Sequence, residues 1–76
     1  MIDAPRKRIL AALLAYEREG EPLPSRKQVA LRVKMTPYGA MFGHHIGLLM
    51  RANLIEYPLG QLALTDSGRK IAEKLP

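Results

Sequence analysis

The side chains that could do chemistry in this 76-residue sequence are two adjacent histidines, a few hydroxyl residues and a group of arginines and lysines. His44 and His45 would point about 100° apart on a helix, which is a poor arrangement for sharing one metal ion. The chain contains no cysteine, so a thiolate metal site and a disulfide are excluded. It also lacks a glycine-rich phosphate loop. We therefore expect no metal, no cofactor and no catalytic site, and we do not expect an enzyme.

The cations are concentrated in the middle of the chain. The net charge is +5, and no Asp or Glu occurs between Pro22 and Ile55. Outside that window the basic and acidic residues balance, so the whole excess of positive charge lies within it. A localised basic region is typical of proteins that bind a polyanion, although a small domain can also be mildly basic by chance. The cations of the window are Arg26, Lys27, Arg32, Lys34 and Arg51.

Two helices are predicted in the first half of the chain. Apolar residues at helical spacing, with a proline in the first turn, predict a helix over residues 4–19 that Gly20 ends. Ser25 and Gln28 form a capping-box pattern, which predicts a second, short helix over residues 25–33.

A third helix is predicted over residues 37–52. Thr36 is expected to cap it, and Pro37 to occupy its first position. Phe42, Ile46 and Leu49 recur at helical spacing and should face the core. Asn53 is expected to end the helix, because asparagine tolerates the left-handed conformation.

The remaining elements are a hairpin and a last helix. Residues 54–57 and 61–64 are predicted to be short strands, joined by a turn in which Gly60 supplies positive φ. Thr65 should cap a helix over residues 66–75. Gly68 is either a weak point in that helix or a position of close packing. The predicted fold is mostly α with a short β-hairpin, in the order helix, helix, helix, strand, strand, helix, within one domain spanning residues 1–76.

This order resembles the winged helix-turn-helix superfamily over nearly the whole chain. Asn53-Leu54-Ile55, a hairpin, and then Leu64-Thr65-x-x-Gly68 form a pattern similar to MarR-like regulators. The chain is also similar to small winged-helix segments of bacterial and phage proteins, and the resemblance implies DNA binding. Winged helices serve as protein-interaction modules too, so this inference from fold is an analogy. The positions that match those segments are Ser25, Val29, Ala30, Thr36, Pro37, Phe42, Ile46, Leu49, Leu54, Ile55 and Glu56, and those that depart are Met35, Tyr38, Gly39 and Asn53.

A DNA complex of this kind would place the third helix in the major groove, with its outward face toward the bases. Arg51 suits a guanine edge or a phosphate, and His44 suits a base edge. The N-terminus of the second helix suits a phosphate, because its N–H groups and helix dipole favour an anion. The residues expected to bind DNA are Ser25, Arg26, Lys27, Arg32, Lys34, Thr36, Tyr38, His44, Gly47, Leu48 and Arg51.

Gly39, Gly43 and Gly47 are spaced four residues apart, although a glycine destabilises a helix by about 0.5–1 kcal/mol relative to alanine. The spacing indicates close approach along one side, by DNA, by the second helix or by a partner helix. If residues 37–41 form a loop instead, Gly39 leaves this pattern.

The expected function is the binding of double-stranded DNA by a transcriptional regulator or by the DNA-binding module of a larger protein. The alternative is a winged helix that binds another protein through Met41, Leu48 and Leu59. A homodimer through the first or last helix is a further expectation that the sequence leaves open. No apolar run approaches the length of a membrane span, and the N-terminus lacks the apolar core of a secretory signal. We therefore expect no membrane partner and a cytoplasmic protein, associated with the nucleoid if prokaryotic.

Overall fold

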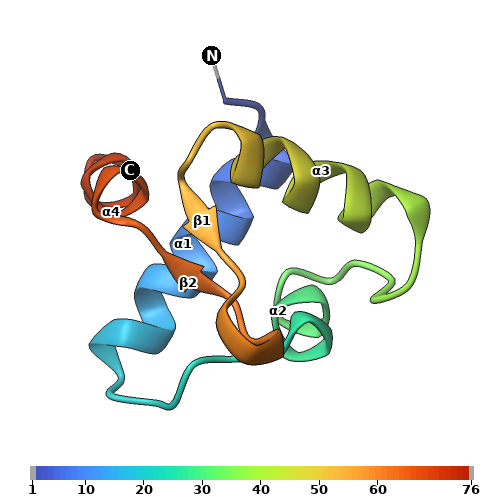
Figure 1. Cartoon of the computed structure of the whole chain (residues 1–76), viewed down its shortest axis with the longest axis horizontal. Helices are drawn as coiled ribbons and strands as arrows, with labels where there is room; N and C mark the ends of the chain where they lie inside the picture. The colour runs from blue at the N-terminus through green and yellow to red at the C-terminus, as the bar shows by residue number, and fades with distance from the viewer. Residues whose placement is uncertain (1, 76) are drawn as a thin grey trace.

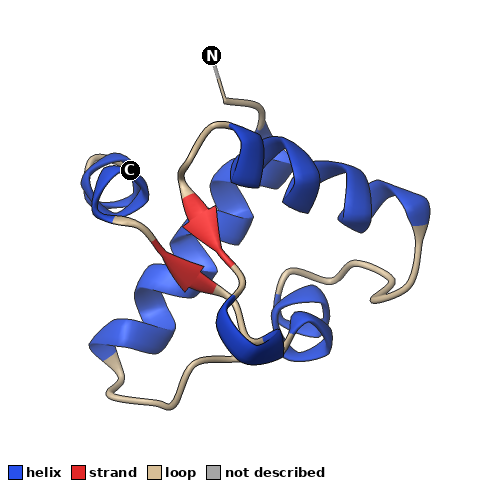
Figure 2. Cartoon of the chain, in the orientation of Figure 1, coloured by secondary structure: helices blue, strands red, loops and turns tan. Residues whose placement is uncertain are grey.

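The computed structural model describes residues 2–75, which form four α-helices and a two-stranded antiparallel hairpin whose strands are joined by a short 3₁₀ turn (Pro58–Gly60) (Figure 1, Figure 2). The mostly helical class and the order of the elements agree with the prediction. Met1 and Pro76, the ends of the predicted domain, lie outside the described residues. The helices are α1 (Ala4–Arg18), α2 (Arg26–Arg32), α3 (Ala40–Arg51) and α4 (Asp66–Glu73), and the strands are β1 (Ile55–Glu56) and β2 (Ala63–Leu64).

Helix α1 is the central packing element, because it contacts α2, α3, α4 and β2. It lies behind the hairpin in Figure 1. Its inward side chains Ile9 and Leu10 are fully buried, and they meet Phe42 and Leu49 of α3 and Leu62 of the hairpin in one core. Within residues 2–75, none of the helices has both the length and the apolar character needed to cross a bilayer.

Three of the helices end at a residue in the left-handed conformation, and the next N–H bonds back to a carbonyl five residues earlier. Gly20 and Asn53 fill this position after α1 and α3, as predicted. After α2 the position is filled by Lys34, whose φ is 61°. The N–H of Met35 then donates to the carbonyl of Ala30 at 2.8 Å. Lysine is strained in this conformation, so its presence here was not predicted.

The start of α3 corrects the prediction. The helix begins at Ala40 with Gly39 as its N-cap, and no side chain caps it. Thr36 does not act as a cap. Its carbonyl oxygen accepts a hydrogen bond from the N–H of Gly39 at 3.1 Å, which closes a turn over residues 36–39. Proline is favoured in the second position of such a turn and glycine in the fourth, so Pro37 belongs to the turn and not to the helix.

The hairpin is shorter than predicted but gains a third segment. Ile55 pairs with Leu64, and Glu56 pairs with Ala63. Beyond β2, Ser25 forms an isolated antiparallel bridge with Gln61. Next to it, the N–H of Leu62 donates to the carbonyl of Pro24 at 2.8 Å. The segment before α2 is extended because Pro22 and Pro24 prevent a helix there, and it lies along the hairpin.

Candidate nucleic-acid interface

The outward face of α3 is formed by Ala40, His44, Gly47 and Arg51. Ala40, His44 and Arg51 are exposed and Gly47 is half-buried, whereas Phe42, His45, Ile46 and Leu49 on the opposite side are buried. The predicted inward residues Phe42, Ile46 and Leu49 are buried, and Ala40, His44 and Arg51 are exposed as predicted.

Leu48, which the sequence also places on the outward side, is half-buried. The outward face carries the cation Arg51 and no acid. Its first residue, Ala40, has a small side chain.

Arg26 joins α2 to α3. Its Nε–H donates to the carbonyl of Pro37 at 3.3 Å, and its guanidinium lies 5.4 Å from the centre of the Phe42 ring. Arg26 is half-buried. Its predicted phosphate contact therefore competes with these intramolecular contacts, and its first role is to hold the start of α2 against the start of α3.

The three glycines have different surroundings. Gly39 lies in the turn before α3, so it leaves the helical pattern. A Cβ at Gly43 would lie 2.9 Å from a terminal nitrogen of Arg26, so this glycine makes room for the guanidinium. A Cβ at Gly47 would have no atom within 4 Å among the described residues outside its own helix. Packing within the molecule explains Gly43 but does not explain Gly47.

The N-terminus of α2 is closed by the predicted capping box. The N–H of Ser25 donates to Oε1 of Gln28 at 2.8 Å, and the N–H of Gln28 donates to Oγ of Ser25 at 3.2 Å. The hydroxyl of Ser25 is therefore engaged in the cap, and its backbone pairs with the hairpin at Gln61. Lys27 is exposed and has no ion-pair partner in the described part of the chain. At this helix end, Lys27 is therefore the side chain best placed to reach a phosphate.

Arg32 and Lys34 lie on a different surface from the outward face of α3. Both line a hollow beside α1, together with Arg8, Ala11, Ala12, Ala15 and Val33. Arg32 donates two hydrogen bonds to the carboxylate of Glu19, at 3.0 and 2.7 Å. The absence of acids between Pro22 and Ile55 therefore does not leave Arg32 unpaired, because Glu19 lies outside that window. The hydrogen bond from Arg32 lowers the pKa of Glu19 below its ordinary value.

The other predicted residues are placed as follows. Tyr38 is 82% exposed in the turn before α3, where its hydroxyl is free to reach a ligand. Thr36 is exposed in the same turn. Leu48 is half-buried at the side of α3, so it is less available as a base or protein contact than its predicted role requires. The structure thus brings together the starts of α2 and α3 and the turn between these helices.

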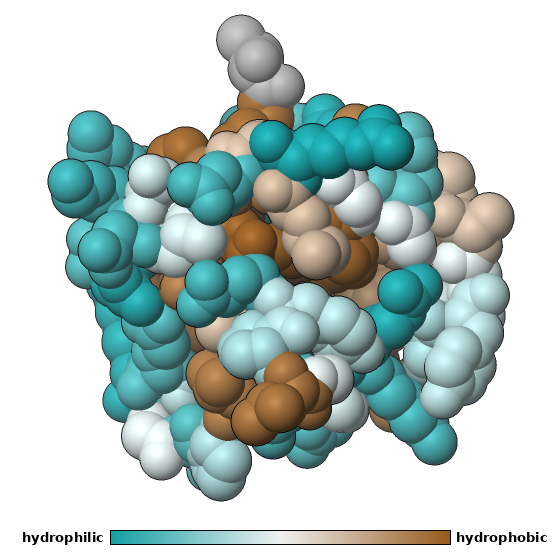
Figure 3. All heavy atoms as spheres, in the orientation of Figure 1, coloured by the Kyte–Doolittle hydropathy of each residue, from teal (hydrophilic) through white to brown (hydrophobic). Residues whose placement is uncertain are grey.

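The hairpin tip lies beside the start of α2, because Gln61 pairs with Ser25. Leu59 at the tip is 99% exposed and has a φ of 52°, which is unusual for a non-glycine residue. Gly60 has the positive φ that was predicted. Hydrophobic side chains gather on the surface over this region in Figure 3. The tip carries no charge, as the sequence shows.

His45 is a site feature that sequence patterns did not reveal. Its side chain is buried, and neither ring nitrogen has a hydrogen-bond partner in the described structure. Its ring centre lies 5.5 Å from that of the exposed His44. Residues 2–75 contain no cluster of three or more potential metal-ligating side chains. Helical spacing alone places His45 at the edge of the core, so only the packing of α3 against its neighbours identifies it as buried.

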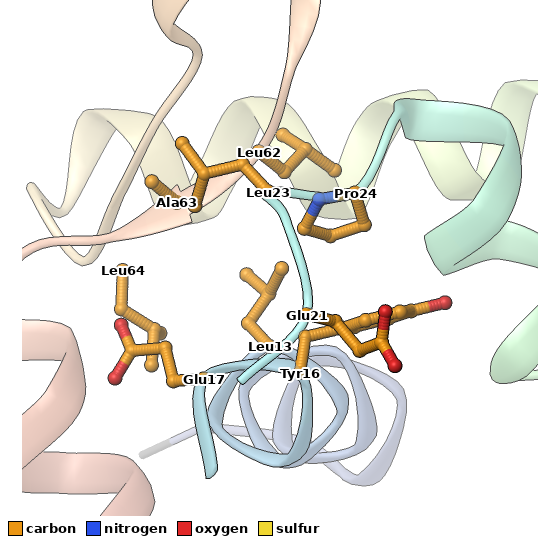
Figure 4. A pocket seen from close by; sticks show the side chains of 9 residues that line it. All are labelled: Leu13, Tyr16, Glu17, Glu21, Leu23, Pro24, Leu62, Ala63 and Leu64. Carbon is orange, nitrogen blue, oxygen red and sulfur yellow. The ribbon is translucent and has the colours of Figure 1, made fainter. Parts of the chain in front are cut away.

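One small cavity lies between α1, the segment before α2 and the hairpin (Figure 4). Its volume is about 20 Å³, which is room for about one water molecule. Leu13, Leu62 and Leu64 contribute apolar walls, and the carboxylates of Glu17 and Glu21 lie at its edges. A cavity of this size does not accommodate an organic substrate.

Comparison of the chain with models of protein families and with curated protein sequences gives no match. We define the α3 surface by five of the eleven predicted residues, which are accessible at the start of α2, in the turn before α3 and along the outward face of α3. They are Lys27, Tyr38, His44, Gly47 and Arg51.

Proposed function

We propose that this protein binds double-stranded DNA as a winged helix, with α3 in the major groove. It would act as a transcriptional regulator or as the DNA-binding module of a larger protein. The order of helices and hairpin supports this proposal, as does the bridge between Ser25 and Gln61 that brings the hairpin tip next to α2. Such a protein would be cytoplasmic, and in a prokaryotic cell it would be associated with the nucleoid.

The observation that carries the proposal is the open space beside Gly47. This glycine lies on the outward face of α3, although alanine there would stabilise the helix by about 0.5–1 kcal/mol. A glycine at such a position has a use if another molecule must come close to the helix backbone. His44 and Arg51 lie on the same face and supply hydrogen-bond donors for base edges and phosphates.

The charges of this surface also suit a duplex. Lys27 at the start of α2 and Arg51 at the end of α3 are exposed, and neither has an ion-pair partner in the described chain. Arg26 serves mainly to orient the two helices, while Arg32 and Lys34 belong to the surface beside α1. The proposed DNA contacts are therefore fewer than the sequence alone predicts, and non-specific binding should be weak.

The test is titration of the protein with random and genomic duplex DNA at two salt concentrations. Each phosphate neutralised should contribute about −0.9 to the slope of log affinity against log salt. The Gly47→Ala variant should unfold at a higher temperature than the parent but bind duplex DNA more weakly. An affinity that does not change with salt, or a Gly47→Ala variant that binds as well as the parent, would remove the support for this proposal.

A second candidate function is protein binding through the same end of the molecule. It is favoured by three exposed apolar side chains, namely Tyr38, Met41 and Leu59. The double variant Lys27→Ala with Arg51→Ala separates the two functions, because DNA binding should be lost while an apolar protein contact should persist. Lys27 is chosen in place of Arg26, since removal of Arg26 would also disturb the packing of α2 on α3.

A homodimer is part of the DNA-binding proposal, because two-fold binders contact half-sites about one helical turn of DNA apart. Sizing of the free protein and of its DNA complex measures this directly. A stoichiometry of one chain per short duplex would argue for a monomeric module.

A further inference from the structure

The outer face of α1 is an unpartnered surface with an apolar floor. Ala11 and Ala15 form a low ridge along the helix, and three shallow hollows adjoin Ala11. The hollow toward the end of α2 has a volume of about 500 Å³, the hollow toward α4 about 460 Å³, and the one near Lys7 and Arg8 about 170 Å³. Leu75, which is half-buried, adds apolar surface to them, and the buried core residues Ala12, Leu14, Val33 and Ala72 lie at their base.

The rim of this surface is strongly basic. Lys7, Arg8 and Arg18 of α1 stand on it with Arg32 and Lys34 from the end of α2, and the acid that lines it is Glu19. Glu19 is held by Arg32, so most of the positive charge on the rim is not neutralised within the described chain. We call the alanine ridge, its hollows and this rim the α1 surface.

The backbone conformation of Lys34 is a second indication that the basic rim binds a partner. The left-handed backbone at this residue would be less strained with glycine, which is the common residue at this type of helix end. The chain nevertheless has a lysine there, and its side chain lines the largest hollow of the α1 surface. A role for the positive charge in binding a partner would explain why lysine is present despite the backbone strain.

We propose that the α1 surface docks an acidic amphipathic helix of a partner protein. The low alanine ridge allows a second helix to approach closely, with its apolar side chains in the hollows and its carboxylates against the basic rim. Helix α1 has 15 residues, so an occupant of about four turns would cover its length. This proposal is independent of DNA binding by the α3 face.

Two other occupants fit less well. A nucleic-acid backbone would satisfy the cations, but it would leave the accessible side chains of Ala11, Ala15 and Leu75 without an apolar partner. A second copy of the chain meeting this surface symmetrically would place one basic rim against another. That contact is unfavourable in a protein whose net charge is already +5.

The probe is a fluorescein-labelled helical peptide of about four turns, with leucine and alanine on one face and glutamate on the other. A peptide of the same composition in scrambled order, which has no apolar face, is the control probe. Fluorescence anisotropy gives the affinity of each, and backbone amide shifts in NMR spectra map the contact. We expect saturable binding of the amphipathic peptide, with shifts at Ala11, Ala15 and Val33.

The variant Arg8→Glu with Arg18→Glu should weaken peptide binding by at least about tenfold. The matched control is Lys27→Glu with Arg51→Glu, which makes the same change in net charge at the proposed DNA contacts. It should alter peptide binding by less than about twofold. Ala15→Gln keeps every charge but raises the ridge, so it should also weaken binding. All substituted side chains are partly or fully exposed. Circular dichroism is to be measured for each variant as a check of folding.

Three results would overturn the proposal. Equal affinity for the scrambled peptide would show a charge effect without a docking surface. An absence of saturable binding would show that the face has no affinity for acidic helices. Duplex DNA that shifts the amides of Ala11 and Ala15, while the peptide does not, would assign the surface to nucleic acid.

Discussion

Gly68, in the first turn of α4, packs directly against the backbone carbonyl of Leu54, just after α3. A Cβ on Gly68 would overlap the carbonyl oxygen of Leu54. Thr65 strengthens the same junction, because its hydroxyl donates to the carbonyl of Asn53 at 2.6 Å and accepts from the N–H of Gly68 at 3.0 Å. The glycine is therefore a point of close packing, which settles the alternative that the sequence left open, and it explains the Leu-Thr-x-x-Gly spacing physically.

Gly68→Ala should destabilise the protein by about 2–4 kcal/mol, because rigid backbone has to move to make room for the methyl group. The higher helix propensity of alanine offsets only about 1 kcal/mol of this. Urea unfolding measures the free energy of unfolding, and Gly47→Ala is the control because its methyl group meets open space. If Gly68→Ala were as stable as the parent, the two backbones would not be in contact.

His45→Leu should stabilise the protein by about 1 kcal/mol. The imidazole is buried with both nitrogens unbonded in the described structure, and burial of an unpaired polar group is unfavourable. The exposed His44→Leu serves as the control and should change stability by no more than about 0.5 kcal/mol. A His45→Leu variant less stable than the parent would indicate that the imidazole makes a favourable contact.

Lys34→Gly should raise the free energy of unfolding by about 0.5–1 kcal/mol, because glycine adopts the left-handed conformation without strain. Lys27→Gly removes the same charge from a helical position and should lower stability by a similar amount. Thermal unfolding of the two variants side by side measures the difference. Equal effects would point to charge and not to backbone conformation.

Glu17 makes stability depend on pH. The hydrogen bonds that it accepts from Arg69, at 2.9 Å each, lower the pKa of its carboxyl below the ordinary 4.5. A group with a lowered pKa in the folded state stabilises the fold above its unfolded pKa, and this contribution is lost as the pH falls through the folded value. The free energy of unfolding should therefore fall as the pH decreases below about 4.5, and Glu17→Gln should reduce this dependence. Lys70→Ala, on the same helix as Arg69, is the control and should keep it.

The parts of the fold that were predicted are those set by neighbouring residues. Ser25 and Gln28 cap α2 through a contact between residues three apart, and Asn53 ends α3 by its own conformational preference. Thr36 and Pro37 were misassigned because two local patterns compete there, and proline suits both the first position of a helix and the second position of a turn.

The candidate site was less predictable because it depends on contacts between distant segments. Arg32 meets Glu19 only when α1 and α2 pack together, so an acid-free window in the sequence did not mean an acid-free surface. Arg26 likewise finds Pro37 and Phe42 only through the angle between α2 and α3. Spacing identified His44 and Arg51 as exposed on α3, because a helix face is a property of one helix, but it did not show that Leu48 is half-buried.

The contacts of Arg26 bear on the thermodynamics of binding. Since its guanidinium holds the start of α2 to the turn and to the Phe42 ring, the two helices already have a fixed relative orientation before a ligand arrives. The conformational entropy that is lost when the two helices are oriented is therefore lost during folding and not during association. A duplex binding at this surface would meet a preorganised unit, and loosening Arg26 would weaken binding through entropy even if every direct contact stayed in place.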